Sequence, residues 1–288
     1  MRETLEKELP WISVSQNVLQ TNEAKDTYKA LLHTEDGLDF ETVLMKNTKD
    51  QWTLCVSSQI GCAMKCTFCA TGAMGLKRSL TSDEIVDQYR FWITYLQENT
   101  EEKRRISNIV FMGMGEPMAN YDNVKTAINT WIDQTDIGPT RITVSTVGIL
   151  WQMDKLLTDP DWPPVRIAVS LHSANQKRRE EIVPSTVPNF INLLREWTKK
   201  YEKMLGNRRH HITFEYTLIA GVNDTEELAK ELGVFASRAG DCKVNVIPLN
   251  SVQGKPFATS EEDSIEKFKK IVASYGIDIT QRRSMGHD

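Results

Sequence analysis

Short apolar runs alternate with amphipathic segments along the chain after about residue 50. Several runs are almost continuously hydrophobic, which is typical of parallel strands that are buried on both faces. The pattern predicts six strands, at residues 52–57, 108–112, 141–145, 165–170, 212–218 and 243–247. Because strands alternate with helices, we expect an α/β fold, a (β/α)6 barrel or an open partial barrel.

The intervening segments carry helix signals. Thr81 with Glu84, and Thr259 with Glu262, have the spacing of a capping box, in which two side chains satisfy the first free N–H groups of a helix. Gly276 is placed to end the last helix. The apolar residues that form helix faces are Ile85, Tyr89, Trp92, Ile93 and Leu96, then Leu228, Leu232 and Phe235, then Ile265, Phe268, Val272 and Tyr275.

Residues 1–50 do not follow this repeat. Alternating apolar and polar positions over residues 28–45 predict antiparallel strands at the N-terminal side. We therefore expect two parts, an appendage of residues 1–50 and a core of residues 51–288.

Three cysteines, Cys62, Cys66 and Cys69, have the spacing C-x3-C-x2-C in one short loop. Iron–sulfur clusters are usually held by four thiolates, so three thiolates predict a four-iron cluster with one open position. The amino and carboxylate groups of S-adenosylmethionine (SAM) fit such a position. Cys55 is close enough in sequence to offer a four-cysteine zinc site as the alternative.

Other chemistry-bearing residues follow the predicted strands, and the carboxyl ends of barrel strands are where active sites gather. The segment GMGEP supplies two glycines for close backbone approach and Glu116, a carboxylate able to bind the SAM ammonium group. Ser145, Ser170, His172 and Asn250 end later strands. Each of these four has an ordinary alternative as a turn or capping residue, and Cys242 reads as a buried hydrophobe.

Composition bounds the function only weakly. The formal net charge of −4 in 288 residues does not indicate a nucleic-acid binder. Basic residues cluster at 77–78, 178–179, 208–211 and 282–283, as solvated surface or as phosphate contacts. No run approaches the ~18 apolar residues of a membrane span, and the charged N-terminus lacks a secretory signal. We expect a cytoplasmic protein whose cysteines serve metal or catalytic roles.

Taken together, the motifs resemble the RlmN/Cfr family of radical SAM RNA adenine methyltransferases, most like its RlmN branch. The resemblance runs from about Leu9 to Asp288. It is carried by TLCVSSQIGCAMKCTFCATGAMG, VFMGMGEPMANYDNV, ITVSTVGI, AVSLHSANQKRREEIVPST, FEYTLIAGVND and VNVIPLN. It implies methylation of C2 of an adenosine in 23S rRNA and in tRNA; methylation of C8, as in the Cfr branch, stays an alternative.

The resemblance also implies roles for single residues. Cys62, Cys66 and Cys69 would bind a [4Fe-4S] cluster. SAM would be bound by Gly115, Glu116, Ser145, Ser170, His172 and Asn250. Glu41 matches the family's proposed proton acceptor, and Cys55 matches the thiol that releases the product by forming a disulfide. The implied route passes through a methylated cysteine and a 5′-deoxyadenosyl radical.

That methyl-carrying cysteine is expected just beyond Asp288, where the sequence ends. We expect an incomplete version of a longer protein; otherwise SAM would be cleaved without methylation of RNA. We also expect the family's N-terminal helical domain to be absent or reduced. The implied partners are RNA and a flavodoxin-type electron donor, with no membrane, and the chain is expected to be a monomer.

Overall fold

A computed structural model describes residues 12–47, 49–99, 105–205, 212–250 and 254–282. Within these residues, ten strands form one sheet in the order β1-β2-β3-β4-β7-β8-β9-β10-β11-β12. From β4 onward, each strand is parallel to the next strand in this order. They are β4 (Trp52–Cys55), β7 (Ile106–Phe111), β8 (Ile142–Thr146), β9 (Arg166–Ser170), β10 (Ile212–Leu218), β11 (Cys242–Pro248) and β12 (Asp278–Gln281).

The six predicted strands are confirmed, and β12 is an addition. Its sequence DITQ has three polar residues in four and lies at the edge of the sheet, so it lacks the apolar run that marks a buried parallel strand. Among the described residues β12 does not pair with β4, and the barrel is therefore open on one side.

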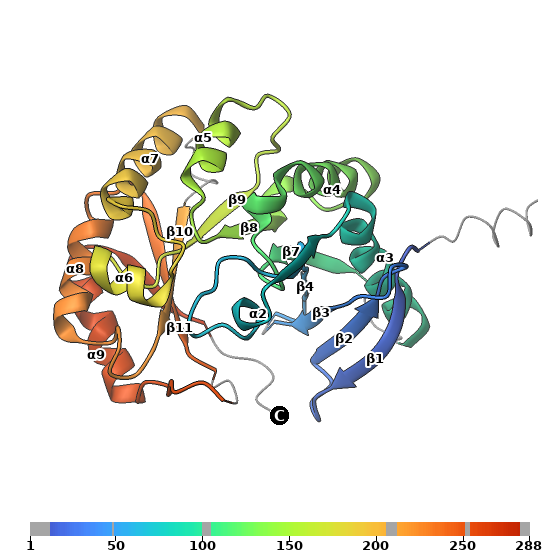
Figure 1. The fold of residues 1–288 in the computed structure, drawn as a ribbon, viewed down its shortest axis with the longest axis horizontal. Helices are drawn as coiled ribbons and strands as arrows, with labels where there is room; N and C mark the ends of the chain where they lie inside the picture. Colours follow the sequence, from blue (N-terminus) through green and yellow to red (C-terminus); the bar gives the residue numbers. More distant parts are fainter. Residues whose placement is uncertain (1–11, 48, 100–104, 206–211, 251–253, 283–288) are drawn as a thin grey trace, which may run out of the picture.

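Helices cover the outer side of the curved sheet (Figure 1). They are α3 (Ser82–Asn99), α4 (Tyr121–Gln134), α5 (Leu150–Thr158), α6 (Gln176–Ile182), α7 (Phe190–Leu205), α8 (Glu226–Ala236) and α9 (Glu262–Ala273), with short 3-10 turns at Pro117–Asn120 and Pro139–Arg141. Their buried positions include Trp92, Leu232 and Phe268, which lie in one continuous hydrophobic core. None of the described helices has the length and apolarity needed to span a membrane.

One of the two predicted capping boxes is confirmed. At the start of α3 the Thr81 N–H donates to Glu84 Oε2 at 2.8 Å, and the Glu84 N–H donates to Thr81 Oγ1 at 3.2 Å. The prediction for Thr259 is wrong. The N-cap of α9 is Glu261, and the Thr259 hydroxyl instead donates to the Leu249 carbonyl at 2.5 Å.

One residue expected on the apolar face of α9 does not lie there. Tyr275 follows the helix and is 37% exposed rather than buried on that face. Gly276 has a φ of 79° just beyond the helix, as a helix-ending glycine does.

The N-terminal strands extend the core sheet. β1 (Ser15–Thr21), β2 (Thr27–His33) and β3 (Asp39–Lys46) are antiparallel, as predicted, and β3 pairs with β4. Buried residues of these strands, such as Phe40 and Leu44, belong to the same hydrophobic core as the barrel. The boundary at residue 50 stays a prediction, because the sheet is continuous across it.

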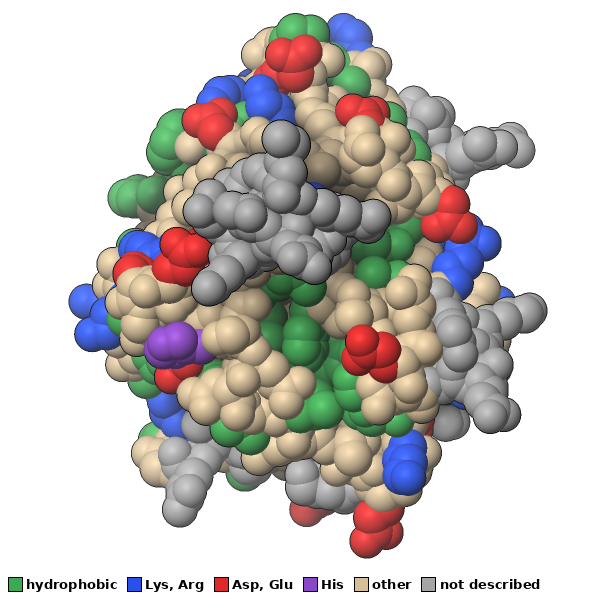
Figure 2. Space-filling model, turned by 90° about the vertical axis from the view of Figure 1, so that its right-hand side faces the viewer, with side chains coloured by type: hydrophobic (Ala, Val, Ile, Leu, Met, Phe, Trp, Pro, Cys, Tyr) green, Lys and Arg blue, Asp and Glu red, His purple; other side chains and the backbone are tan. Residues whose placement is uncertain are grey.

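The described residues on the face shown in Figure 2 form no single basic patch. Among its described residues, hydrophobic side chains gather near the middle of the face, and acidic and basic side chains lie scattered around them. Any recognition of a polyanion by these residues therefore relies on individual contacts more than on a broad positive surface.

Candidate functional site

The three clustered cysteines lie on a loop that a small hairpin holds. Strands β5 (Gln59–Gly61) and β6 (Leu76–Ser79) pair antiparallel on either side of it. The Cys62 N–H donates to the Gly75 carbonyl at 3.0 Å and closes the base of the loop. The far end is tied to the rest of the barrel, where the Thr67 N–H donates to the Ile182 carbonyl at 2.9 Å. Short helix α2 (Ala70–Ala73) follows directly after the third cysteine.

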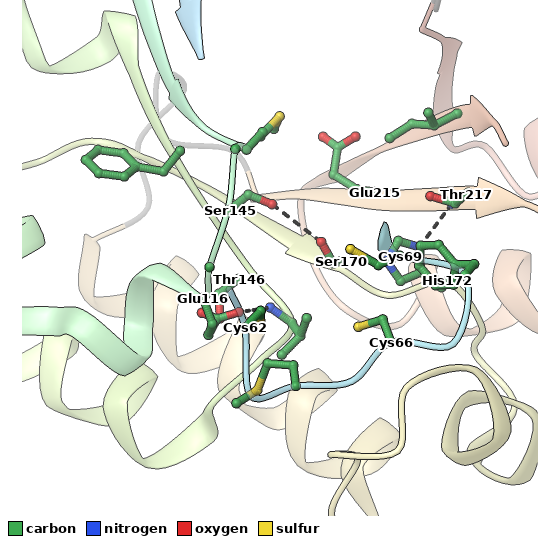
Figure 3. A pocket seen from close by; sticks show the side chains of 18 of the residues that line it. Cys62, Cys66, Cys69, Glu116, Ser145, Thr146, Ser170, His172, Glu215 and Thr217 are labelled. Atoms are coloured by element: carbon green, nitrogen blue, oxygen red, sulfur yellow. Dashed lines mark hydrogen bonds between the residues drawn. The ribbon is translucent and has the colours of Figure 1, made fainter. Parts of the chain in front are cut away.

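These thiols line a cavity of about 280 Å³ at the carboxyl ends of the strands (Figure 3). Five further residues predicted from sequence line the same cavity, namely Gly115, Glu116, Ser145, Ser170 and His172. The remaining lining residues include Met64, Phe68, Phe111, Met112, Gly113, Thr146, Val147, Glu215, Thr217, Ile247 and Arg282. Residues that lie more than 100 positions apart in sequence therefore meet at one place, as the barrel rule predicts.

Glu116 is a buried carboxylate aimed at this cavity and held by backbone donors. Its side chain accepts from the Met118 N–H at 3.0 Å and from the Val147 N–H at 2.8 Å. Burial raises the pKa of Glu116, while these bonds and the hydroxyl of Thr146 oppose that rise. The carboxylate is thus fixed in orientation before any ligand binds.

The turn that presents Glu116 needs its glycine. Gly115 has a φ of 98°, and a Cβ there would lie 2.5 Å from the Cβ of Gln59 and 2.7 Å from its backbone nitrogen. The Gln59 side chain in turn accepts from the Glu116 N–H at 2.9 Å. Close backbone approach, predicted from the GMGEP motif, is therefore a feature of the structure.

The strand-end serines and His172 form the opposite wall. The hydroxyls of Ser145 and Ser170 lie 3.4 Å apart. His172 is buried, and its Nδ1 accepts from the Thr217 N–H at 3.1 Å. Burial lowers the pKa of His172 to about 3. The imidazole is therefore neutral near pH 7 and carries its proton on Nε2.

Arg179 corrects the expectation that the basic pair at 178–179 lies on the surface. Arg178 is exposed, but Arg179 is buried. Its guanidinium donates to the carbonyls of Leu171, Val147 and Ser170, to the hydroxyl of Thr186, and packs over the ring of Phe190. Burial lowers its pKa, and Cys66 and Glu116 oppose that change. Arg179 thus clamps the loops that follow β8 and β9.

The other basic clusters have separate outcomes. Arg78 bonds both Asp36, in the turn between β2 and β3, and Glu84 of α3, so it joins two parts of the fold. Arg282 lines the cavity, and its Nη1 lies 2.9 Å from the sulfur of Met112. The cluster at 208–211 and residue 283 lie outside the described residues.

Three predicted site residues do not line the cavity. Asn250 is exposed just after β11. The Glu41 side chain is 47% exposed and pairs with Lys29 at 3.4 Å. Cys55 is buried at the end of β4, and burial raises its pKa to about 11. Cys55 nevertheless bonds the backbone of Met112, a residue of the cavity wall, so it lies directly behind that wall.

The donor set fits a cluster better than a single ion. Three thiols from one loop line the cavity without Cys55, and three is one fewer than a closed four-cysteine zinc site needs. No group of three His, Cys, Asp or Glu residues within the described part of the chain could hold one metal ion. Burial raises the pKa of Cys62 to about 11 and that of Cys66 to about 12, so binding of iron must displace their protons.

Comparison with known proteins decides the family. A model described as the radical SAM superfamily matches residues 56–232. The probable dual-specificity RNA methyltransferase RlmN of Aquifex aeolicus (strain VF5) is 45% identical over 270 residues, which cover 92% of this chain and 74% of that protein. The chain belongs to the RlmN family. A protein of the same name from Dictyoglomus turgidum (strain DSM 6724 / Z-1310) is 42% identical and covers 91% of this chain and 73% of its own length.

Solved structures agree with membership of the RlmN family. A crystal structure of a radical SAM methyltransferase from Sphaerobacter thermophilus superposes with a TM-score of 0.89 at 37% identity and covers 99% of this chain and 82% of that one. Spore photoproduct lyase complexed with dinucleoside spore photoproduct shares the fold, with a TM-score of 0.57 at 14% identity over 80% of this chain and 76% of its own. The cofactors of this RlmN-family chain are a [4Fe-4S] cluster and SAM, and the zinc alternative is wrong.

Several polar residues of the site were missed by sequence reasoning. Thr146 and Glu215 line the cavity, and Arg179 braces it from behind. Glu215 had a visible signal, because a carboxylate interrupts the apolar run of β10. No sequence signal marked the burial of Arg179, because the adjacent Arg178 has the same charge but an exposed side chain.

Proposed function

We propose that this radical SAM methyltransferase modifies C2 of an adenosine in 23S rRNA and in tRNA. One observation carries the proposal. The three thiols, the fixed carboxylate of Glu116 and the serine pair meet in one cavity, in a chain 45% identical to a probable dual-specificity RNA methyltransferase.

The residues present fit both cofactors. Cys62, Cys66 and Cys69 would hold three corners of the cluster, and Glu116 would accept hydrogen bonds from the ammonium group of SAM. When bound, cluster and SAM supply homolytic chemistry that reaches carbon atoms which are not nucleophilic, such as C2 of adenine. The protein's own task is to orient these groups and to exclude water.

The opposite wall would bind the sugar of SAM. The hydroxyls of Ser145 and Ser170 both donate and accept, and His172 offers one N–H from Nε2 because Nδ1 is already bonded to Thr217. Gly115 would let the ligand approach the backbone. Asn250, exposed at the end of β11, stays a predicted SAM contact.

Two family roles remain predictions for residues outside the cavity. Glu41 would accept the ring proton, and its carboxylate must then leave Lys29, which lies at 3.4 Å. Cys55 would release the RNA product by forming a disulfide with the methyl-carrying cysteine. Met112 must then move aside. Glu41 also contacts the segment after β7 to which Met112 belongs, since the sulfur of Met114 accepts from the Glu41 N–H at 3.3 Å.

The substrate and partner proposals follow from the same chemistry. A base inside a duplex cannot reach an enclosed cavity, so the target adenosine must leave its stack, which costs a few kcal/mol and favours bases in loops. We expect a flavodoxin-type electron donor, a monomeric enzyme, and a cytoplasmic location alongside its RNA substrates.

The test uses protein purified without oxygen from its native source, so that its natural ends are present. Mass spectrometry of 23S rRNA and tRNA treated with SAM and a reductant should show 2-methyladenosine, and a methylated cysteine should appear in a peptide beyond Asp288. Formation of 8-methyladenosine would indicate Cfr-type chemistry. Release of 5′-deoxyadenosine from SAM with unchanged RNA would contradict the methyltransferase proposal.

A further inference from the structure

A row of polar side chains crosses four parallel strands inside the barrel. Ser170 of β9 is in register with Glu215 of β10, Glu215 with Asn245 of β11, and Asn245 with Thr280 of β12. Register partners in a parallel sheet project from the same face. The row therefore begins at the serine pair of the cavity and runs toward the open edge of the sheet.

Hydrogen bonds connect most of this row. The side-chain amide of Asn245 donates to Oε1 of Glu215 at 3.0 Å. The hydroxyl of Thr280 donates to Oδ1 of Asn245. The orientation of the Asn245 amide is thereby set by Thr280, and the amide in turn sets the orientation of the Glu215 carboxylate.

The second oxygen of Glu215 is different. The residue is 4% exposed and lines the cavity, yet Oε2 is fully buried and has no hydrogen-bond partner among the described residues. Leaving a buried acceptor unpaired is unfavourable, and more so for a charged group. A purely structural acid would be expected to have both oxygens paired, as Glu116 has.

The position of Glu215 in the cavity wall indicates which groups could bond Oε2. Glu215 lies above Ser170 in the view of Figure 3, on the same wall as Thr217. A ligand there must offer an O–H or N–H donor. An adenosine moiety offers both kinds, in its ribose hydroxyls and its 6-amino group, and the serine pair beside Glu215 suits the same polar groups.

We infer that Oε2 of Glu215 accepts a hydrogen bond from a hydroxyl or amino group of an adenosine moiety bound in the cavity. The inference rests on the proposed function. SAM and the target nucleotide both contain this moiety, and the experiment below separates the two sources. Asn245 acts as a positioning residue, because it holds the carboxylate and does not itself line the cavity.

The test is Glu215→Gln, which keeps the side-chain size and an oxygen for Asn245 but removes the charged acceptor. Hydrogen bonds to charged groups contribute about 1.5–3 kcal/mol, which corresponds to an affinity loss of roughly tenfold or more. Isothermal titration calorimetry with SAM, on cluster-loaded protein matched for iron and sulfide, gives the first value. The KM for an RNA substrate gives the second.

The two measurements distinguish the sources. A weaker affinity for SAM with an unchanged KM for RNA assigns the contact to SAM, and the reverse assigns it to the target nucleotide. If both stay within twofold of wild type, the inference is overturned even where the wild type makes 2-methyladenosine. If the wild type makes none, the proposed function fails, while calorimetry still tests Glu215.

Two further variants keep the test sharp. Glu226→Gln makes the same change on an exposed residue that pairs with Lys267 at 2.6 Å, and both values should stay unchanged. Asn245→Ala leaves the carboxylate but removes its donor, so it should weaken the same ligand by a smaller factor. SAM analogues that lack one ribose hydroxyl should lose affinity for the wild type and not for Glu215→Gln if that hydroxyl is the donor.

Discussion

Replacing Arg179 by methionine removes a buried guanidinium that bonds three backbone carbonyls, those of Leu171, Val147 and Ser170. Methionine has a comparable length and no donor. Each carbonyl left without a partner in the interior costs about 1–3 kcal/mol, or about 3–9 kcal/mol for three. Loss of the contact with the Phe190 ring, at 3.7 Å, adds to this cost.

A compensating gain reduces the total. A buried cation costs several kcal/mol of hydration, and the variant no longer has to meet that cost. We therefore expect the free energy of unfolding to fall by about 3–5 kcal/mol, which at about 2 °C per kcal/mol for a chain of this size lowers Tm by about 6–10 °C. The affinity for SAM should fall as well, because the clamped carbonyls belong to the loops beside the serine pair.

The neighbouring residue supplies the matched control. The Arg178 side chain is 39% exposed and pairs with Glu181, one turn along the same helix. An exposed pair of this kind contributes less than about 1 kcal/mol, so Arg178→Met should be nearly neutral. Urea titration of both variants measures the difference. If Arg179→Met is within about 1 kcal/mol of Arg178→Met, the clamp does not stabilise the barrel as we reason.

Three further predictions address the cavity. Because the folded-state pKa of His172 is about 3 against 6.5 when unfolded, the unfolded chain binds the extra proton between these values and stability falls as the pH drops below 6.5. Urea titrations should show that, from about pH 6 to 4, the free energy of unfolding of His172→Gln falls by about 1.4 kcal/mol less per pH unit than that of wild type. If the two proteins lose stability in parallel as the pH falls, the reasoning is contradicted. Gly115→Ala should abolish SAM binding in calorimetry, whereas Gly37→Ala, at a φ of 83° in open space, should bind normally. Cys62→Ala should lose most of the iron and sulfide found in wild type, and Cys55→Ala should keep them. An equal loss in both variants would instead support a site that is formed by four cysteines.

Much of the fold was readable because its buried strands are continuous apolar runs. The predicted range 212–218 coincides with β10, and other strands shift by a residue or two. β12 was not predicted, because DITQ at the sheet edge has no apolar run. The Thr259 box failed because an S/T-x-x-E pattern records local spacing, whereas the tertiary contact with Leu249 decided where that hydroxyl bonds.

The site residues that could be predicted from sequence are those that lie at the ends of predicted strands. Glu116, Ser170 and His172 meet because parallel strands place their carboxyl ends together. Burial within one helical turn is harder to read. Arg178 and Arg179 look alike in sequence, and only the packing of α6 against the loops after β8 and β9 distinguishes them. Glu41 shows the opposite limit, since alternation placed it on an antiparallel strand and could not say which side of the wall its carboxylate faces.

The contact between Arg282 and Met112 has a mechanical consequence. On this side of the barrel the described strands are not joined edge to edge, and the Arg282 side chain reaches the sulfur of the residue after β7 instead. A closed barrel joins its first and last strands by a ladder of backbone hydrogen bonds, whereas this contact between the residue after β12 and the segment after β7 is made by side chains. Among the described residues, the cavity wall at this place is therefore formed by a side chain, that of Arg282, and not by a strand ladder, so substituting Arg282 would alter the wall while leaving the sheet intact.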